Sequence, residues 1–489
     1  MVFSSLTFLC IFLPILLIVT YLVKTTAARN ILLVAASLLF YAFGEPVYIL
    51  LIVASIFLNY AFGLRIGAAR HAAQQDAGDP AAEGTGRKNG AAKRALIAAV
   101  IVNLGLLGTF KYVGWIISGL NGLFGFAIPD LHLSLPIGIS FYTFQALSYI
   151  IDVYRGNARP QKRISRFFLY ISFFPQLIAG PIIKYHDIEK EIADRSMNAR
   201  DTAFGMRRFF FGLAKKVLIS NILAAAADAV FAMNAQEMGG LAAWTGAVSY
   251  MLQIYFDFSG YSDMAIGLGQ MFGFHFMENF NHPYTSVNIR DFWRRWHISL
   301  STWFKEYLYI PLGGNRKGKA RACLNKLIVF FCTGLWHGAN LTFVIWGLFH
   351  GAFLLLEEAL PIRKLPKVLG HIYTLLVVCV GFVIFRADTF GDAVSVIGKM
   401  FSGFPMTHLQ TILSVKILTP LFLAVLVIAV FFSMDHHLTR KAVLLPGEAP
   451  VKTSGRKEIV LFIASGVLFL LCMLYLSGGG YNPFIYFRF

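Results

Sequence analysis

Charged residues are scarce in this chain of 489 residues. Asp, Glu, Lys and Arg make up 14% of the sequence, whereas hydrophobic residues make up 57%. Because a soluble domain usually carries about 25% charged residues, this composition argues against a soluble enzyme, a disordered chain and a disulfide-rich scaffold. The few charges are also unbalanced, since 43 basic and 25 acidic residues leave a formal net charge of +18. In a membrane protein this excess indicates a basic cytoplasmic face and does not require nucleic acid as a partner.

Cysteine and several familiar catalytic motifs are lacking as well. The sequence has 5 cysteines and no CxxC spacing, so we predict neither a disulfide framework nor a metal site. It contains no GxSxG elbow, Walker loop or HExxH motif. We find no internal repeat, and no strand-like alternation long enough to indicate a barrel.

Long apolar runs are what the sequence has in abundance. At about 20 residues per span, they predict roughly ten to thirteen helices, some of them short or re-entrant. We therefore expect an all-α polytopic membrane protein with one domain over residues 1–489. Its expected parts are N-terminal spans (1–66), a flexible cytoplasmic loop rich in Ala, Gly and Gln (67–94), a catalytic core (95–360) and C-terminal spans (361–489).

Basic residues gather in a few connections between the apolar runs. The stretch 153–166 holds five basic residues and no acidic one, and the stretch 290–326 holds nine against Asp291 and Glu306. The positive-inside rule places these stretches, together with 65–94, on the cytoplasmic side.

Ionisable residues within apolar segments are functional candidates, because each costs a few kcal/mol in hydrocarbon. Asp257 and Asp263 are six residues apart, about 240° around a helix, so one continuous helix cannot aim both at one point. We expect Gly260 to break the helix between them. The carboxylates and Ser259 either tie helix ends together or, with Tyr261, line a substrate tunnel.

A second group of candidates lies in the segment from Asp291 to Asn315. A single helix there would present one largely aromatic face, made of Trp293, Trp296, His297 and Leu300. We expect this helix to lie at the cytoplasmic interface with its aromatic face toward protein. Arg294 and Arg295 project elsewhere, to contact either lipid headgroups or the phosphates of a ligand.

A third group begins with His337, which has apolar residues on both sides and so lies at membrane depth. One alternative is a structural histidine that is satisfied by a backbone carbonyl. The histidine 40 residues upstream and the surrounding WHGAN favour a function. His350 follows after 13 residues, about 220° around a helix, and is expected to point away from His337 in a supporting or structural role.

The chemistry that suits these residues is proton abstraction. A neutral imidazole in a tunnel is a ready general base, and burial lowers its pKa by disfavouring the cation. Such a base deprotonates a hydroxyl as it attacks a thioester, a role worth roughly 10²–10⁴ in rate. His297 would hold the donor carbonyl or stabilise the oxyanion. Basic residues at the cytoplasmic mouth suit a phosphate-rich carrier such as coenzyme A.

Several motifs resemble the membrane-bound O-acyltransferase (MBOAT) family. They are WRRWHISLS, LGGNR, LWHGAN and WGLFHG, with FFPQLIAGPI and YFDFSGYSDMAIGLG earlier in the chain. Within that family the chain is most similar to bacterial polysaccharide O-acetyltransferases of the alginate type. The resemblance implies a ring of tilted helices around a tunnel. It places the family's invariant histidine on His337 and its variable second polar residue on His297.

We therefore expect a membrane O-acetyltransferase in the bacterial inner membrane, with His337 as general base and His297 as its partner. The resemblance implies acetyl-CoA as donor substrate, no bound cofactor, a polysaccharide acceptor and an extracytoplasmic partner of the SGNH type. Further residues expected along the tunnel are Asp257, Ser259, Tyr261, Asp263, Trp296, Asn340 and His350, and those expected to attract the donor are Arg294 and Arg295. The alternatives are D-alanyl transfer to teichoic acid and a proton-coupled transporter, which would need inverted repeats that we do not find.

Overall fold

A computed structural model of the chain is built from helices. It describes residues 1–77, 85–129, 131, 133–234, 236–404, 406–434 and 455–483, and no strand occurs among them. The prediction of an all-α fold is confirmed. The described residues form two compact units, one of Met1–Val2, Thr7–Ala203 and Leu268–Phe276, the other of Phe3–Leu6, Phe204–Gly267 and Met277–Phe489.

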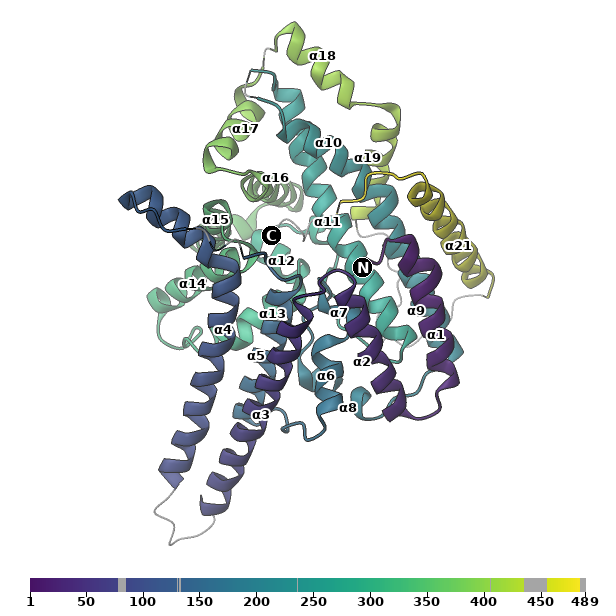
Figure 1. The fold of residues 1–489 in the computed structure, drawn as a ribbon. Helices are drawn as coiled ribbons and strands as arrows, with labels where there is room; N and C mark the ends of the chain where they lie inside the picture. The colour runs from purple at the N-terminus through teal and green to yellow at the C-terminus, as the bar shows by residue number, and fades with distance from the viewer. Residues whose placement is uncertain are drawn as a thin grey trace. The chain divides into compact units, whose positions relative to one another are not determined.

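The first unit consists mainly of the N-terminal helices (Figure 1). They are η1 (Phe8–Phe12), α1 (Leu13–Leu22), α2 (Thr26–Ala42), α3 (Ile49–Ala77), α4 (Thr85–Phe124), α5 (Ile139–Arg155), α6 (Ile164–Ser172), α7 (Phe174–Leu177) and α8 (Tyr185–Ala193). The two long helices α3 and α4 lie side by side.

The segment 67–94, which we expected to be a flexible loop, is largely helical. Helix α3 continues to Ala77 and α4 begins at Thr85, while residues 78–84 lie outside the described part of the chain. The reason is composition, because alanine has the highest intrinsic helix propensity. Alanine-rich sequence therefore prolongs the two apolar helices instead of ending them.

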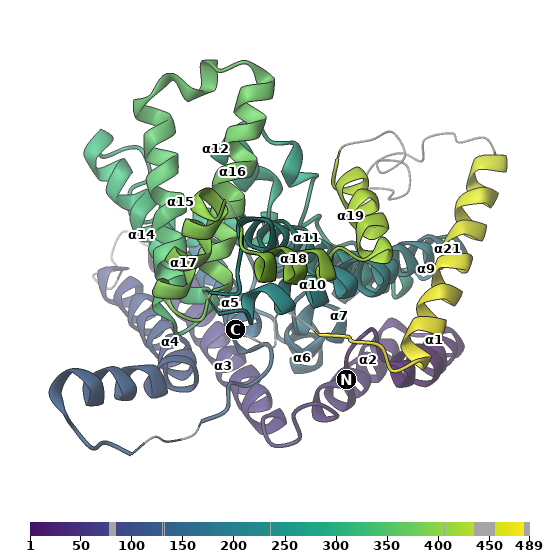
Figure 2. The same ribbon diagram turned by 90° about the horizontal axis from the view of Figure 1, so that it is seen from above.

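The second unit holds the elements that carry most of the candidate residues. They are the greater part of α9 (Ala199–Ala214), η2 (Lys215–Ser220), α10 (Asn221–Phe231), α11 (Gly240–Met271), η3 (Pro283–Thr285), α12 (Ile289–Arg295), α13 (Ile298–Phe304), η4 (Lys305–Tyr309), α14 (Lys319–His337), α15 (Leu341–Ala359), η5 (Pro361–Lys364), α16 (Lys367–Arg386), α17 (Phe390–Ser402), α18 (His408–Ile417), α19 (Pro420–Ser433) and α21 (Gly455–Ser477). Helices α14, α15 and α16 are consecutive neighbours in space (Figure 2).

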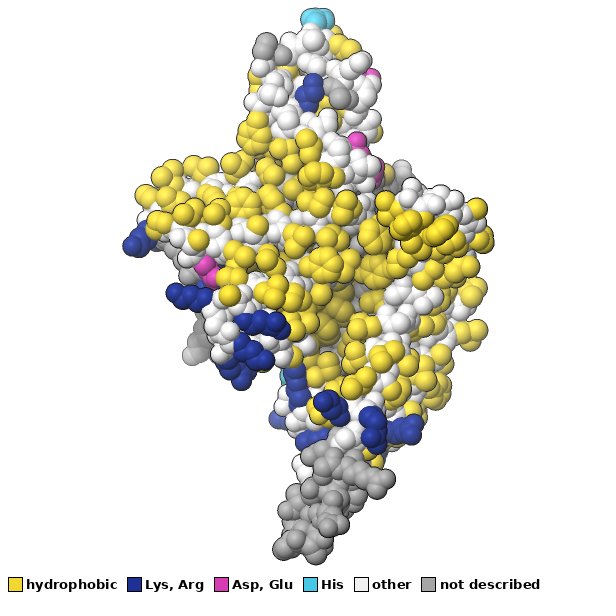
Figure 3. Space-filling view, turned by 90° about the vertical axis from the view of Figure 1, so that its left-hand side faces the viewer, with side chains coloured by type: hydrophobic (Ala, Val, Ile, Leu, Met, Phe, Trp, Pro, Cys, Tyr) yellow, Lys and Arg dark blue, Asp and Glu magenta, His cyan; other side chains and the backbone are white. Residues whose placement is uncertain are grey.

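Six described helices are long and apolar enough to cross a membrane. They span 49–74, 90–124, 199–231, 341–359, 367–386 and 455–477, and the bent pair of α18 and α19 would make a seventh. Large apolar side chains on these helices remain exposed, such as Leu123 and Leu474. In Figure 3, hydrophobic side chains cover most of the visible face, and Lys and Arg side chains gather beside them. Such a surface suits contact with lipid tails.

Two glycines allow α14 and α15 to approach closely. A Cβ atom on Gly347 would lie 2.2 Å from the carbonyl oxygen of Phe330, and one on Gly334 would lie 2.4 Å from that of Phe343. Side chains are therefore excluded where the two helices meet. This contact fixes the end of α14, where His337 lies, against the helix that carries Trp346 and His350.

Gly260 does not break its helix, contrary to our expectation. Helix α11 runs without interruption from Gly240 to Met271. A Cβ atom on Gly260 would lie 2.7 Å from the carbonyl oxygen of Gly212. Glycine is therefore needed here for close packing against α9. The helix continues through it because a single glycine within an apolar helix lowers the stability of the helix without ending it.

We predict that Gly347→Ala lowers the stability of the protein by about 1–3 kcal/mol, because the added methyl group meets backbone that cannot rotate away. The measurement is thermal unfolding of the full chain in detergent. Gly466→Ala is the control, since a Cβ atom there meets nothing within 4 Å. Equal unfolding temperatures for the two variants would contradict the close contact.

Candidate active site

The chain breaks its helix at His297, and this break determines where the ring lies. Helix α12 ends at Arg295, Trp296 is extended, and His297 has φ 43° and ψ 54° before α13 begins at Ile298. Our expectation of one continuous helix with Trp296 and His297 on one face is therefore wrong. A left-handed backbone is uncommon for a residue other than glycine, and such conformations cluster at functional sites.

The ring of His297 lies in a small pocket of aromatic and amide groups. Its centroid is 4.6 Å from that of Phe258 on α11 and 5.8 Å from that of Trp336 on α14. Its Nδ1 atom is 3.2 Å from Oδ1 of Asn279. Burial lowers the pKa of His297 to about 3, so the imidazole is neutral at physiological pH.

His337 is the last residue of α14 and lies among aromatic rings. The ring centroids of Trp336, Trp346 and Phe385 are 5.0, 5.1 and 5.0 Å away. Since His297 also contacts Trp336, the two histidines lie against the same indole. The structure thus brings together two residues that are 40 positions apart in the sequence.

His350 lies against Trp346, the indole that His337 also contacts. Its ring centroid is 5.2 Å from that of Trp346 and 5.3 Å from that of Trp293. The three histidines have exposed fractions of 1% (His297), 8% (His337) and 0% (His350). Neither ring nitrogen of His350 has a hydrogen-bond partner within the described residues.

Asp257 and Asp263 form ion pairs that join α11 to α9 and η2. Asp257 pairs with Lys216 at 2.5 Å, and Asp263 pairs with Arg208 at 2.9 Å and with Lys215 at 2.6 Å. These contacts correspond to the first of our two interpretations, in which the carboxylates tie helices together. Ser259 and Tyr261 are buried on the same helix, where the Tyr261 ring stacks on Phe3 at 4.7 Å.

Trp296 and Asn340 have structural contacts. Trp296 is buried and stacks on Phe292, with ring centroids 5.5 Å apart. Asn340 is the residue before α15, where its side-chain oxygen accepts the backbone N–H of Thr342 at 3.1 Å. This is the ordinary cap of a helix N-terminus.

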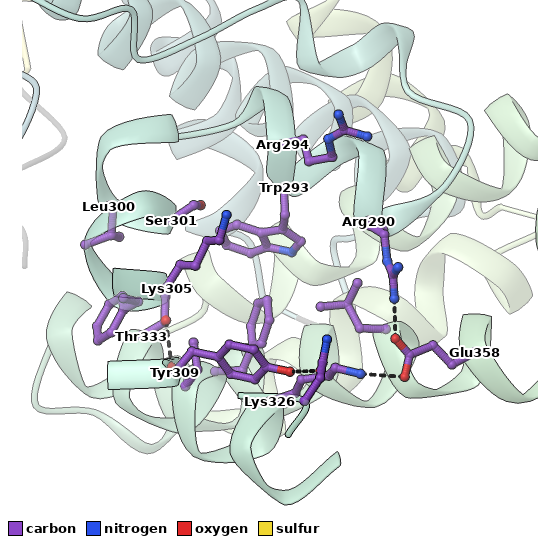
Figure 4. A pocket seen from close by; sticks show the side chains of 15 residues that line it. Arg290, Trp293, Arg294, Leu300, Ser301, Lys305, Tyr309, Lys326, Thr333 and Glu358 are labelled. Atoms are coloured by element: carbon purple, nitrogen blue, oxygen red, sulfur yellow. Dashed lines mark hydrogen bonds and ion pairs between the residues drawn. The ribbon is translucent and has the colours of Figure 1, made fainter. Parts of the chain in front are cut away.

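A cavity of about 570 Å³ opens between α12, α13, η4 and α14 (Figure 4). Four basic residues line it, namely Arg290, Arg294, Lys305 and Lys326. Arg290 and Lys326 pair with Glu358, whereas Arg294 and Lys305 form no ion pair with any described residue. Arg295 is not among the lining residues and pairs with Asp291 at 3.1 Å.

One wall of this cavity belongs to α14, the helix that ends at His337. Thr333 lines the cavity and precedes His337 by one helical turn, so the two occupy the same face of α14. Trp293 also lines the cavity, and its ring centroid is 5.8 Å from that of Trp346, which contacts His337. In Figure 4 the Lys305 side chain extends toward Trp293.

Sequence reasoning missed Asn279 as a site residue. Its side chain is fully buried and contacts His297, Ser299 and Ser262. The segment MENF contains Asn279, but a single amide 18 residues before its histidine gives no spacing signal.

Known proteins are similar in sequence to this chain over its whole length. Residues 162–361 match the model of the membrane-bound O-acyltransferase family. The chain is 41% identical over 507 aligned residues to a Pseudomonas putida protein named probable alginate O-acetylase AlgI, with all of both chains covered. It is 46% identical to the Pseudomonas aeruginosa protein of that name, over 82% of this chain and 75% of the relative. A peptidoglycan O-acetyltransferase of Helicobacter pylori is 38% identical over 84% of this chain and 82% of its own.

The chain therefore belongs to the membrane-bound O-acyltransferase family. It is a multi-pass membrane enzyme that transfers an acyl group to a hydroxyl. The family and the O-acyltransferase activity that we expected from the sequence are both confirmed.

We predict that Asp263→Asn destabilises the protein by about 3 kcal/mol or more, because it removes a negative charge from the buried Arg208 and from Lys215, whose side chain is only 27% exposed. Chemical unfolding of the purified protein in detergent measures the loss. Glu358→Gln is the matched control, since its ion pairs are partly exposed and are worth at most about 1 kcal/mol. A similar loss of stability in both variants would show that the buried ion pairs of Asp263 stabilise the protein no more than the partly exposed pairs of Glu358 do.

Proposed function

We propose that this enzyme transfers an acetyl group from acetyl-CoA on the cytoplasmic side of the bacterial cytoplasmic membrane to hydroxyl groups of an exported polysaccharide. Relatives named alginate O-acetylase and peptidoglycan O-acetyltransferase support both the acetyl group and the polysaccharide. The observation that carries the proposal is the pair of buried imidazoles against Trp336, one helical turn from a cavity lined with basic residues.

In the proposed reaction His337 is the general base. It takes the proton of the acceptor hydroxyl while the oxygen attacks the carbonyl carbon of the thioester. The new C–O bond forms, the C–S bond breaks, and the thiolate of coenzyme A leaves with the proton from the imidazolium. The aromatic rings around His337 support this role because they keep water, a competing nucleophile, away from the thioester.

The cavity beside α12 and α14 is the proposed entrance for the donor. Coenzyme A carries several phosphate groups, and Arg294 and Lys305 have charge to offer them. Arg295 is a weaker candidate, since Asp291 already neutralises it. The acetyl end would reach His337 along the face of α14 that carries Thr333.

Delivery to the polysaccharide is proposed to involve an extracytoplasmic partner of the SGNH type, as the resemblance implies. D-alanyl transfer to teichoic acid is the alternative reaction of the family. The names of the relatives at about 40% identity favour acetyl transfer over it.

We predict that His337→Ala lowers acetyl transfer by roughly 10²–10⁴, the contribution of a general base. The measurement uses the purified full chain with labelled acetyl-CoA and deacetylated alginate oligosaccharides. His337→Gln, which preserves more of the volume, is expected to be equally inactive while unfolding at the wild-type temperature.

His408→Ala is the matched histidine control, because His408 is exposed on α18. It should transfer acetyl groups at the wild-type rate. Undiminished transfer by both His337 variants would remove His337 from the reaction.

We predict that Lys305→Glu raises the KM for acetyl-CoA by about tenfold or more, since a charge-assisted hydrogen bond is worth about 1.5 kcal/mol or more, and leaves kcat nearly unchanged. Lys319→Glu makes the same charge change at an exposed position outside the cavity and should leave KM unaltered. A fall in kcat without a change in KM would place the donor phosphates elsewhere.

A further inference from the structure

The amide of Asn279 has only one orientation that its neighbours permit. The backbone N–H of Ser299 donates to Oδ1 at 3.2 Å, and the Ser299 hydroxyl donates to the same atom at 2.9 Å. On the other side, Nδ2 donates to Oγ of Ser262 at 3.2 Å. Because a backbone N–H can only donate, the atom facing Ser299 must be the oxygen.

This orientation determines where His297 carries its hydrogen. Nδ1 of His297 lies 3.2 Å from Oδ1 of Asn279, and an amide oxygen can only accept. Nδ1 is therefore the protonated nitrogen, and in a neutral imidazole Nε2 is then the acceptor. Nε2 is buried and has no hydrogen-bond partner in the part of the chain that the structure describes.

The surroundings of the ring keep it neutral. Phe258 faces it from α11 and Trp336 from α14, and neither carries a charge. The titratable groups nearby on these elements are Asp257 and Asp263, both in ion pairs, and His337 against the Trp336 indole. Glu278, next to Asn279 in the chain, pairs with Arg208 at 2.6 Å.

We propose that Asn279 is a positioning residue that fixes this tautomer, and that Nε2 of His297 accepts a hydrogen bond from a hydroxyl group of the acceptor sugar. This role rests on the proposed function and deepens it. It replaces our expectation that His297 donates to the thioester carbonyl or the oxyanion, because an unprotonated Nε2 has no hydrogen to donate.

The role fits an acceptor with neighbouring hydroxyl groups. One hydroxyl donates to Nε2 of His297, and the next gives its proton to His337 as its oxygen attacks the thioester. No proton moves to His297, so the bonds and protons of the proposed reaction are the same as described above. His297 and Asn279 thus select for a polyol acceptor and place it, while His337 does the chemistry.

The first test is solid-state nitrogen NMR of the full chain in lipid bilayers with labelled histidine. The signals of His297 are assigned by their loss in His297→Gln. We expect Nδ1 protonated and Nε2 unprotonated from about pH 5 to about pH 8, and a shift of the Nε2 signal when deacetylated alginate oligosaccharides are added. A protonated Nε2, or an Nε2 signal that the oligosaccharides leave in place, would overturn the proposal.

The second test is Asn279→Asp, which still accepts from Nδ1 but places a negative charge beside the ring. This charge raises the pKa of His297, so the ring is cationic below the new pKa and Nε2 becomes a donor. We expect the KM for the oligosaccharide to rise roughly tenfold or more below that pH and to recover above it, with the KM for acetyl-CoA unchanged. An Nε2 that serves the oxyanion predicts the opposite, an undiminished or higher kcat at low pH.

Ser262→Ala is the matched control, because it removes the other partner of the Asn279 amide and leaves the contact with Nδ1. Its pH profile should stay that of the wild type, whereas a merely structural role for Asn279 predicts the same flat profile for both variants. The NMR experiment measures the tautomer without any turnover. A wrong tautomer would therefore overturn the role of Asn279 without affecting the proposed function, which the His337 variants test separately.

Discussion

The cost of holding an imidazole away from water is the constraint on which this site depends. Three histidines are buried in the second unit, and aromatic rings lie against each of them. Burial away from water disfavours the charged form of an imidazole, so it favours the neutral base. A neutral imidazole is also the form that can accept a proton. Under the proposed function, the packing that excludes water from the site also keeps its histidines in the form that can act as a base.

Rigid connections around the site keep these rings in place. The glycine contact between α14 and α15 brings backbone against backbone, so the end of α14 has little room to move. On the other side, Asp263 and Glu278 share Arg208, and Glu278 immediately precedes Asn279. The ion pairs thus hold the segment whose amide orients His297. In the structure, Asp257 and Asp263 join helices through ion pairs, which is the first of the two interpretations that the sequence left open.

The aromatic residues between the cavity and His337 separate two environments. Trp293 faces the basic cavity on one side and contacts His350 and Trp346 on the other. In the proposed function, the phosphate groups of the donor would lie on the cationic cavity side and its thioester behind the indoles, away from water. Arg294 and Lys305 lie on the cavity side of this boundary. Under that proposal, one short stretch of chain would serve both a charged carrier and a reaction with which water competes.

The sequence by itself determined the helical class, the apolar spans and the candidate histidines, because hydropathy and motif are local properties of the chain. It misjudged the alanine-rich ends of α3 and α4, the continuity of α11 at Gly260 and the break at His297. Each of these depends on a competition that the sequence pattern does not show. Helix propensity outweighed the loop-like composition at the ends of α3 and α4, and close packing against α9 kept α11 continuous at Gly260. At His297, tertiary contacts outweighed the helical periodicity. Only the tertiary structure brought Asn279 to His297, since a hydrogen bond between residues 18 positions apart is decided by how the intervening chain folds. The tautomer of the ring, and with it the direction of its hydrogen bond, follows from that contact together with the contacts of Ser299 and Ser262 that orient the Asn279 amide.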